Sequence, residues 1–423
     1  MLVENIFIEL RSRLRSCNVY ITTGIDFSKS CNLKISIQSN CIVLNYVDDI
    51  QSEKSKRRDS LSSIESLSDC YSEDETEIAT VIPIEKFCSI IPNSMSCLKI
   101  DKNTISFRIL TEPKNGGNFF TEVIQANSTP SESNVSSLEI NVKIDNDLKI
   151  VCSNCSNVVT EGMTKFGRVL ELPSENMDMS EWFCHGHGHG HGESHEEVPL
   201  PKEVLTPNKQ DFLYRLTYFV VNNSILSEKT NKFNSKRDIY HCNRCLAWLG
   251  LKNKNTVKFF NSEVKIVQND TESTAFSHKN TVDKLSLDDF IYTIEKMAKE
   301  FNLGLQYNLM FKIVLECTIS AAKRQFLLIW VIDKELQVLR GCMERISSDK
   351  VVLQSSVLSK VLYKVEFAKN EEVEAWLADP LAVTTDISKS MFCSGLEHLQ
   401  KMSLRVPECF RNANGYFVSY LKV

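Results

Sequence analysis

Apolar and polar residues alternate in short segments along the first third of the chain. The clearest of these segments are residues 3–10, 32–38, 41–47, 79–87, 98–110 and 138–152. A period of two places every second side chain on one face of a β-strand. The pattern therefore predicts a β-rich N-terminal domain over residues 1–151, and it predicts that the strands up to residue 47 have one solvent-exposed face.

Residues 48–77 interrupt this pattern. They are rich in serine and charged residues and contain few large apolar side chains. Such a segment buries too little apolar surface to offset the entropy of ordering its backbone. We expect a disordered insertion between strands of one domain, because the entropy of closing a loop rises slowly with loop length.

Residues 152–250 have a different character, with few long alternating segments and a proline-rich stretch at 197–207. Two cysteine pairs mark the ends of this region. The composition predicts a loop-rich middle region held together by its cysteines.

The last part of the chain, residues 251–423, mixes both periodicities. Residues 286–301 carry apolar side chains on one helical stripe, and Ser286 with Asp289 has the spacing of a capping box. Further helices are expected near residues 371–379 and 391–402. The expected strands are residues 256–267, 306–317, 325–332, 336–343, 361–367 and 416–423.

The final expected strand follows an Asn-Gly pair at Asn414 and Gly415, which favours a tight hairpin turn. Bulky residues occur at alternate positions on both of its faces, so we expect both faces to be covered. Helices and strands in this order predict an α+β fold, in which a mixed α/β C-terminal domain follows the β-rich domain and the middle region.

Composition adds limits on function and location. The net charge of -5 comes from 49 basic and 54 acidic residues, which disfavours a nucleic-acid surface as the main function. The first residues lack the pattern of a signal peptide, and the longest apolar run, 326–332, is too short to cross a bilayer. We expect a protein of the cytosol or nucleus that binds neither membrane nor nucleic acid directly.

Fifteen cysteines in a chain without an export signal are expected to be reduced. Cys152 and Cys155 form one CxxC pair, and Cys242 and Cys245 form a second pair after a gap of 86 residues. Two such pairs supply the four sulfur ligands that Zn²⁺ favours in structural sites. The alternatives are two redox pairs or four buried cysteines without metal.

These pairs belong to a wider pattern that resembles the HECT-like ubiquitin-protein ligases, a family that binds ubiquitin-conjugating enzymes. The resemblance is carried by both CxxC pairs, by the segment RVLELPSENMDMSEWFCH at residues 168–185, and by the C-terminal segment YFVSYLKV. It runs from about residue 3 to the C-terminus and skips the 48–77 insertion. Known signatures of hydrolases, kinases and dehydrogenases are missing from the sequence.

The resemblance implies a ubiquitin-protein ligase that accepts ubiquitin from a conjugating enzyme and transfers it to protein lysines. It also implies an alternative, because members are linked to the metal-dependent endonuclease of pre-mRNA 3′-end cleavage. In that case the chain would be a non-catalytic partner that stabilises or inhibits the nuclease.

A ligase of this kind needs a cysteine that accepts ubiquitin as a thioester. In HECT ligases this cysteine lies near the C-terminus, beside a threonine and ahead of a leucine. Cys393 lies 31 residues from the end by inclusive count, but Phe392 replaces the threonine. Cys393 is therefore the candidate catalytic residue, and the alternative is a buried position on an amphipathic helix. Cys409 is a weaker candidate.

Five of the eight histidines lie in or beside the His/Gly loop at residues 185–195. Alternating glycines impose no fixed geometry, so any metal affinity there would be incidental. Trp182, Cys184 and His185 precede this repeat and fit the family pattern. They are candidate partner-binding residues, whose Cys-His tip could enter a partner's metal centre, complete a zinc site with one CxxC pair, or simply cap a loop.

Overall fold

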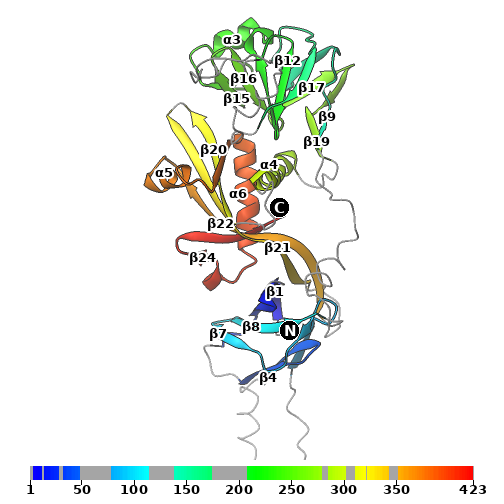
Figure 1. Cartoon of the computed structure of the whole chain (residues 1–423), viewed down its shortest axis with the longest axis vertical. Coiled ribbons are helices and arrows are strands. Elements are labelled where there is room, and N and C mark those ends of the chain that lie inside the picture. The colour runs from blue at the N-terminus through cyan, green and yellow to red at the C-terminus, as the bar shows by residue number, and fades with distance from the viewer. Residues whose placement is uncertain are drawn as a thin grey trace, which may run out of the picture. The chain divides into compact units, whose positions relative to one another are not determined.

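Figure 1 shows the computed structural model of the chain. The structure describes residues 3–11, 14–27, 32–47, 78–113, 138–173, 207–278, 284–301, 310–320, 322–342 and 351–422. The chain divides into two compact units, which do not follow its order. The first unit contains Met1–Ser133, Asp333–Lys360 and Met402–Tyr420, and the second unit contains Asn134–Ile332, Val361–Lys401 and Leu421–Val423.

The first unit is built from β-strands. Its larger sheet includes β1 (Val3–Arg11), β2 (Ser16–Thr23), β6 (Ser89–Ile90), β7 (Ser96–Asp101) and β8 (Thr104–Glu112). β1 pairs with β2 and β2 pairs with β8, in each case antiparallel, while residues 337–340 of β21 (Lys323–Cys342) pair with the other edge of β1. The interior is filled by aliphatic side chains such as Ile6, Ile8, Val19 and Ile105.

A smaller sheet of the first unit contains β3 (Asn32–Ile37), β4 (Cys41–Val47) and β5 (Ile78–Pro83). β4 and β5 are antiparallel neighbours, with Cys41 opposite Pro83 and Tyr46 opposite Ile78. The two strands that flank residues 48–77 are thus paired directly with one another. The expected insertion itself lies outside the described residues.

β1 does not have the solvent-exposed face that we expected for the N-terminal strands. Its residues from Ile6 to Leu10 are all buried, because β2 and β21 cover its two edges and side chains cover both faces. The buried set includes a carboxylate, Glu9, which is fully inaccessible to solvent. The prediction of a solvent-exposed face was wrong for this strand.

Three side chains from three other strands surround Glu9. Lys360 Nζ on β22 (Val352–Glu366) lies 2.7 Å from Glu9 Oε1, and Asn18 on β2 donates a hydrogen bond of 2.9 Å to Oε2. The hydroxyl of Tyr420 on β25 (Tyr416–Leu421) also donates to Oε1. Burial acts to raise the pKa of Glu9, but the charge and hydrogen bond of Lys360 and the other donors outweigh it and lower the pKa.

The second unit contains a six-stranded sheet and two smaller ones. The six-stranded sheet has the order β11 (Arg168–Glu171), β12 (Asp211–Arg215), β13 (Tyr218–Asn222), β16 (Thr256–Phe260), β15 (Trp248–Asn253) and β14 (Ile239–His241). The small sheets are β10 (Leu148–Cys152) with β17 (Val264–Gln268) and β18 (Thr271–Ser273), and β9 (Leu138–Ile140) with β19 (Phe276–His278). Within residues 152–250 the described part thus forms regular strands that the sequence pattern did not single out.

β20 (Phe311–Ser320) pairs with β21 and, in parallel, with β23 (Ala382–Asp386). Four helices belong to the described part of the second unit, and the second and third of them contact β20. They are α3 (Glu228–Phe233), α4 (Leu285–Phe301), α5 (Glu371–Leu377) and α6 (Lys389–Ser403), with a short 3₁₀ turn, η4, at Asn223–Ile225. Mostly antiparallel, mixed sheets accompanied by a few helices confirm the α+β class. No helix among the described residues is long and apolar enough to cross a membrane.

α4 confirms the predicted helix but not its predicted cap. Phe290, Ile294 and Met297 of the predicted stripe are buried in the core. The helix begins at Leu285, so Ser286 and Asp289 lie inside it rather than at the cap. Ser286 Oγ bonds instead to Ser394 Oγ at 2.7 Å, and the buried Asp289 contacts His278 Nε2 at 2.7 Å. The capping-box prediction was wrong.

α6 packs closely against α4, and Figure 1 shows the two helices side by side in the second unit. Gly395 makes this approach possible. A Cβ atom at this position would lie 2.4 Å from ring carbons of the fully buried Phe290. This contact constrains how far α6 is shifted along its axis and how it is rotated about that axis relative to α4. Cys393 lies on the same helix.

The C-terminal hairpin agrees largely with the sequence. Asn414 and Gly415 have positive φ values of 52° and 85° and connect β24 (Asn412–Ala413) to β25, after a 3₁₀ turn, η5, at Glu408–Phe410. Both faces of β25 are covered from Val418 onward, but Phe417 is 46% exposed. The predicted strands 325–332 and 336–343 are parts of the single long strand β21.

Candidate functional site: a four-cysteine cluster and a thiol-lined pocket

The first CxxC pair forms a tight turn after β10. The Cys152 N–H donates to the Asn157 carbonyl at 2.9 Å, and the Ser156 N–H donates back to the Cys152 carbonyl at 2.9 Å. Ser156 has a φ of 53°, in the left-handed region that closes such a turn. The turn directs the side chains of Cys152 and Cys155 to the same side.

The second CxxC pair repeats this turn after β14. The Cys242 N–H donates to the Ala247 carbonyl at 2.9 Å, and the Leu246 N–H donates to the Cys242 carbonyl at 3.0 Å. Leu246 has a φ of 61°, at the position equivalent to Ser156. We call these two turns the first and second knuckle. The turn of each knuckle is specified locally, because the backbone hydrogen bonds that close it join residues within a few positions of the cysteines.

The two knuckles face one another and bring four sulfur atoms together. Cys152 Sγ lies 3.7 Å from Cys245 Sγ, Cys155 Sγ lies 3.7 Å from Cys242 Sγ, and all four atoms are within 4.8 Å of one another. A disulfide would need about 2.05 Å. Sulfurs at about 2.3 Å from a central zinc ion, in a regular tetrahedron, lie about 3.8 Å apart. The four cysteines are therefore close enough to bind one metal ion.

The electrostatics of the cluster suit a cation. Burial raises the pKa of Cys152 to about 12 and also raises that of Cys155. Burial acts in the same direction on Cys245, but hydrogen bonds from the Asn154 side chain, the Ala247 backbone and the neighbouring thiols lower its pKa to about 6. Negative charge therefore gathers at Cys245, and a divalent cation bound by the four sulfurs would release the remaining thiol protons.

Residues around the cluster hold the knuckles in place. Asn157 Nδ2 in the first knuckle donates a hydrogen bond of 2.8 Å to Asn243 Oδ1 in the second. Cys152 and Cys242 are fully buried in a core that also contains Phe219, Tyr240 and Phe259. This packing holds the two knuckles together in addition to any metal ion.

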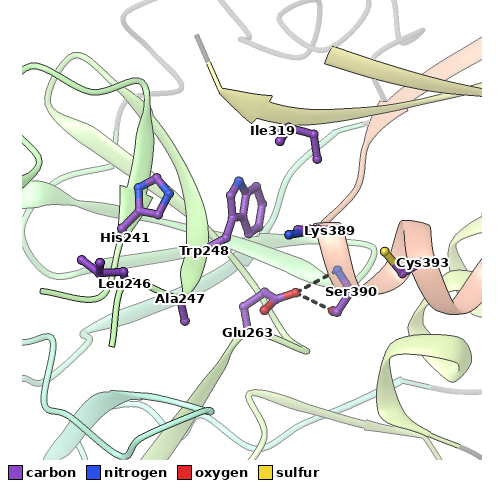
Figure 2. A pocket seen from close by; sticks show the side chains of 9 residues that line it. All are labelled: His241, Leu246, Ala247, Trp248, Glu263, Ile319, Lys389, Ser390 and Cys393. Atoms are coloured by element: carbon purple, nitrogen blue, oxygen red, sulfur yellow. Dashed lines mark hydrogen bonds between the residues drawn. The ribbon is translucent and has the colours of Figure 1, made fainter. Parts of the chain in front are cut away.

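A pocket of about 410 Å³ lies in the same unit. Figure 2 shows its walls, with the second knuckle on one side and the start of α6 on the other. It is lined by His241, Leu246, Ala247, Trp248, Glu263, Ile319, Lys389, Ser390 and Cys393. Cys393 is exposed, so the alternative of a buried position on the helix was wrong.

The start of α6 is fixed by a network of hydroxyl groups and one carboxylate. Ser388 caps the helix, because its Oγ accepts a hydrogen bond of 3.1 Å from the Met391 N–H. Ser390 donates to Glu263 Oε1 through both its hydroxyl and its backbone N–H, as Figure 2 shows. Ser262 Oγ lies 3.1 Å from the hydroxyl oxygens of both Ser388 and Ser390.

The sequence pointed to the four cysteines and Cys393 as candidate site residues, but not to the residues around them. The serines ahead of Met391 match a helix-capping signal that was available in the sequence. Glu263 and Trp248 carried no signal, because they reach the pocket only through the fold. Trp182, Cys184, His185 and the His/Gly loop lie outside the described residues, so their proposed role in binding a partner stays a prediction.

The two sites define a class of protein: one with a four-cysteine cluster able to hold a metal ion and, in the same unit, a pocket that contains a free thiol. The family model for HECT-like ubiquitin-conjugating enzyme (E2)-binding proteins matches residues 9–418. The chain belongs to this family, whose description indicates an interaction with ubiquitin-conjugating enzymes. No curated protein and no solved structure matches the chain significantly.

Proposed function

We propose that the protein is a ubiquitin-protein ligase in which Cys393 accepts ubiquitin from a bound conjugating enzyme. The observation that carries the proposal is the exposed Cys393 thiol in a pocket of a chain that belongs to an E2-binding family. A thioester acceptor must be reachable by a second protein and must present its sulfur as a nucleophile. Cys393 meets the first requirement directly.

Other described cysteines fit this role less well. Burial raises the pKa of Cys317 to about 12 and holds that of Cys17 far above its usual range, so both remain protonated thiols. The cluster cysteines have their sulfurs directed at one another. Cys97 and Cys409 are exposed, but neither lines the pocket, and burial acts to raise the pKa of Cys409.

The position of Cys393 on α6 supports acyl transfer. Phe392 is buried and takes the place of the threonine found in HECT ligases, while the next side chain, Cys393, is exposed. Lys389 precedes Cys393 by four residues, so it lies on the same face of the helix and also lines the pocket. Its positive charge suits the oxyanion that forms when a thiolate attacks a thioester.

The proposed reaction has two balanced steps. In the first, the Cys393 thiol gives up its proton, its sulfur bonds to the carbonyl carbon of the ubiquitin thioester, and the bond from that carbon to the sulfur of the conjugating enzyme breaks. The departing thiolate takes up one proton, which balances the proton lost from Cys393. In the second, a substrate lysine amine attacks the same carbonyl carbon. The bond to Cys393 then breaks, an amide forms, and the proton lost from the amine balances the thiolate that is released.

Adduct formation tests this proposal. The full-length protein is mixed with conjugating enzymes charged with ubiquitin and quenched without reductant. We expect an adduct that dithiothreitol removes, that is missing in Cys393→Ala, and that persists in Cys97→Ala and Cys409→Ala. An adduct of unchanged yield in Cys393→Ala would rule out Cys393 as the acceptor.

The four-cysteine cluster is proposed to hold a structural zinc ion. The observed sulfur spacing of 3.7 Å, the full burial of Cys152 and Cys242, and the equal geometry of the two knuckles support this assignment. Four thiolates also suit iron, so metal analysis decides between the two ions. Because cysteine sulfurs would fill all four coordination positions, the ion would crosslink distant parts of the chain. It would have no open coordination position for a substrate.

A second candidate function is a binding protein without catalysis. It is favoured by one observation: among the described residues, no hydrogen bond joins a general base to the Cys393 sulfur. The partner would be a conjugating enzyme or, as the family resemblance implies, the 3′-end cleavage endonuclease. Stable co-purification with either partner by the Cys393→Ala variant, and no adduct with the wild type, would favour this function over ligase activity.

A further inference from the structure

The second knuckle forms one wall of the pocket that contains Cys393. His241 directly precedes Cys242, and Leu246, Ala247 and Trp248 directly follow Cys245. All four residues line the pocket within three positions of a cluster sulfur. The backbone turn that directs Cys242 and Cys245 toward a metal therefore also sets the position of this wall.

Trp248 connects this wall to the rest of the pocket. Its indole Nε1–H donates a hydrogen bond of 3.0 Å to the Thr318 carbonyl on β20, next to the pocket residue Ile319. Its ring lies 5.3 Å from that of Phe260, which is fully buried. Movement of the second knuckle would break this hydrogen bond or disturb that ring contact.

The first knuckle holds the turn that carries Glu263, another residue of the pocket lining. The Ser153 N–H donates to the Glu263 carbonyl at 3.1 Å, and Ser153 Oγ donates to the Ser262 carbonyl at 3.3 Å. Ser153 lies between the two cysteines of its pair. The position of the turn at residues 261–263 thus depends on the first knuckle.

The same turn holds the start of α6. The Glu263 carboxylate accepts two hydrogen bonds from Ser390, and Ser262 contacts both Ser388 and Ser390. Cys393 lies three residues after Ser390, less than one helical turn away. A continuous chain of contacts therefore runs from the cluster, through Glu263, to the helical turn that presents the thiol.

We propose that metal bound by the four cysteines determines the position and accessibility of Cys393, and that Glu263 is the positioning residue between them. The proposal rests on the proposed function for the importance of Cys393, but the coupling itself does not require ubiquitin transfer. Both knuckles contact the pocket or its supporting turn, so loss of the ion would release two sides of the pocket together. Metal occupancy would then control whether the acceptor thiol is correctly presented.

Thiol alkylation tests the coupling without any transfer activity. The full-length protein, with metal or after removal of metal by a chelator, is treated with iodoacetamide, and modification of each cysteine is followed by peptide mass spectrometry. We expect Cys393 to react severalfold faster after metal removal, because the walls around it loosen. The exposed Cys97, in the first unit, serves as an internal control and should keep its rate.

Two variants separate the role of Glu263 from a general loss of structure. With metal bound, Glu263→Ala should also increase the rate at Cys393 and not at Cys97, whereas Glu263→Gln, which keeps an acceptor oxygen for Ser390, should stay near the wild-type rate. Because coupling is reciprocal, Glu263→Ala should also weaken metal binding in a competition assay with a chromophoric chelator.

Each outcome decides the question. An unchanged Cys393 rate after verified metal loss overturns the proposal. If Cys393 and Cys97 both react faster after metal removal, the metal-loaded Glu263→Ala variant decides: a faster rate at Cys393 alone supports the coupling, and an unchanged rate contradicts it. A failed ubiquitin adduct would refute the ligase function and leave these alkylation results intact.

Discussion

Asn157 and Asn243 join the two knuckles by a direct side-chain hydrogen bond of 2.8 Å, although 86 positions separate them in the sequence. Each asparagine lies within two residues of a cluster cysteine. The bond therefore helps to fix the distance between the two knuckles. The local geometry of either knuckle alone does not determine this distance.

Replacing Asn157 by alanine should weaken metal binding by about tenfold, as is common when a residue that supports metal ligands is lost. Affinity can be measured by competition for Zn²⁺ with a chromophoric chelator. Asn255→Ala, at an exposed position of the same unit, is the matched control and should retain wild-type affinity. Equal affinities for all three proteins would show that the asparagine bridge does not support the cluster.

Glu9→Gln should destabilise the first unit by about 3 kcal/mol, because it leaves the ammonium of Lys360 largely buried without its counter-charge. Hydrogen exchange of the β1 and β2 amides in the full-length protein reports the stability of this unit. Glu112→Gln on β8 replaces an exposed glutamate in the same unit and should have little effect. If both variants lost hydrogen-exchange protection of the β1 and β2 amides to a similar extent, the assigned role of Glu9 would be contradicted.

The same pair predicts a pH dependence. The folded pKa of Glu9 lies below its ordinary value of 4.5, so its contribution to stability is present above pH 4.5 and is lost as the pH falls through the folded pKa. Protection of the β1 amides should therefore decrease below about pH 4.5 in the wild type. Glu9→Gln should lack this part of the decrease, and identical pH profiles would refute the assignment.

Gly395→Ala should destabilise the packing of α6 against α4 by about 1–3 kcal/mol, because the new methyl group would overlap the buried Phe290 ring. The better helix propensity of alanine offsets only part of this cost. Thermal unfolding measures the effect, with Gln400→Ala, an exposed position on α6, as the control. Adding Phe290→Leu should recover part of the loss, whereas strictly additive effects would mean that the two positions do not touch.

The knuckles could be predicted from sequence because their geometry is local. The turn that carries Cys152 and Cys155 is closed by hydrogen bonds that reach no further than Asn157, and the second pair repeats this arrangement. The spacing of the cysteines therefore contains most of the information about the turn. The helical stripe of α4 and the Asn-Gly turn before β25 were predictable for the same reason.

Other features could not be predicted because they depend on distant residues. Glu9 looks like an exposed position in an alternating strand, but β21, Lys360 and Tyr420, all more than 300 residues away in the sequence, contribute to its burial. The capping-box prediction for α4 was wrong because neither side chain bonds to the backbone of its own helix. Ser286 bonds to Ser394 on α6, and Asp289 contacts His278. The pocket around Cys393 likewise combines side chains from segments more than 100 residues apart.

Metal analysis of the purified full-length protein tests the central claim most directly. If the four sulfurs form one site, the wild type should contain one zinc ion per chain, and the Cys155→Ser, Cys245→Ser double variant should contain none while remaining expressed. Co²⁺ added to the metal-free wild type should give the absorption of a tetrahedral four-thiolate site. A wild-type protein that purifies without metal and binds neither Zn²⁺ nor Co²⁺ would contradict the account.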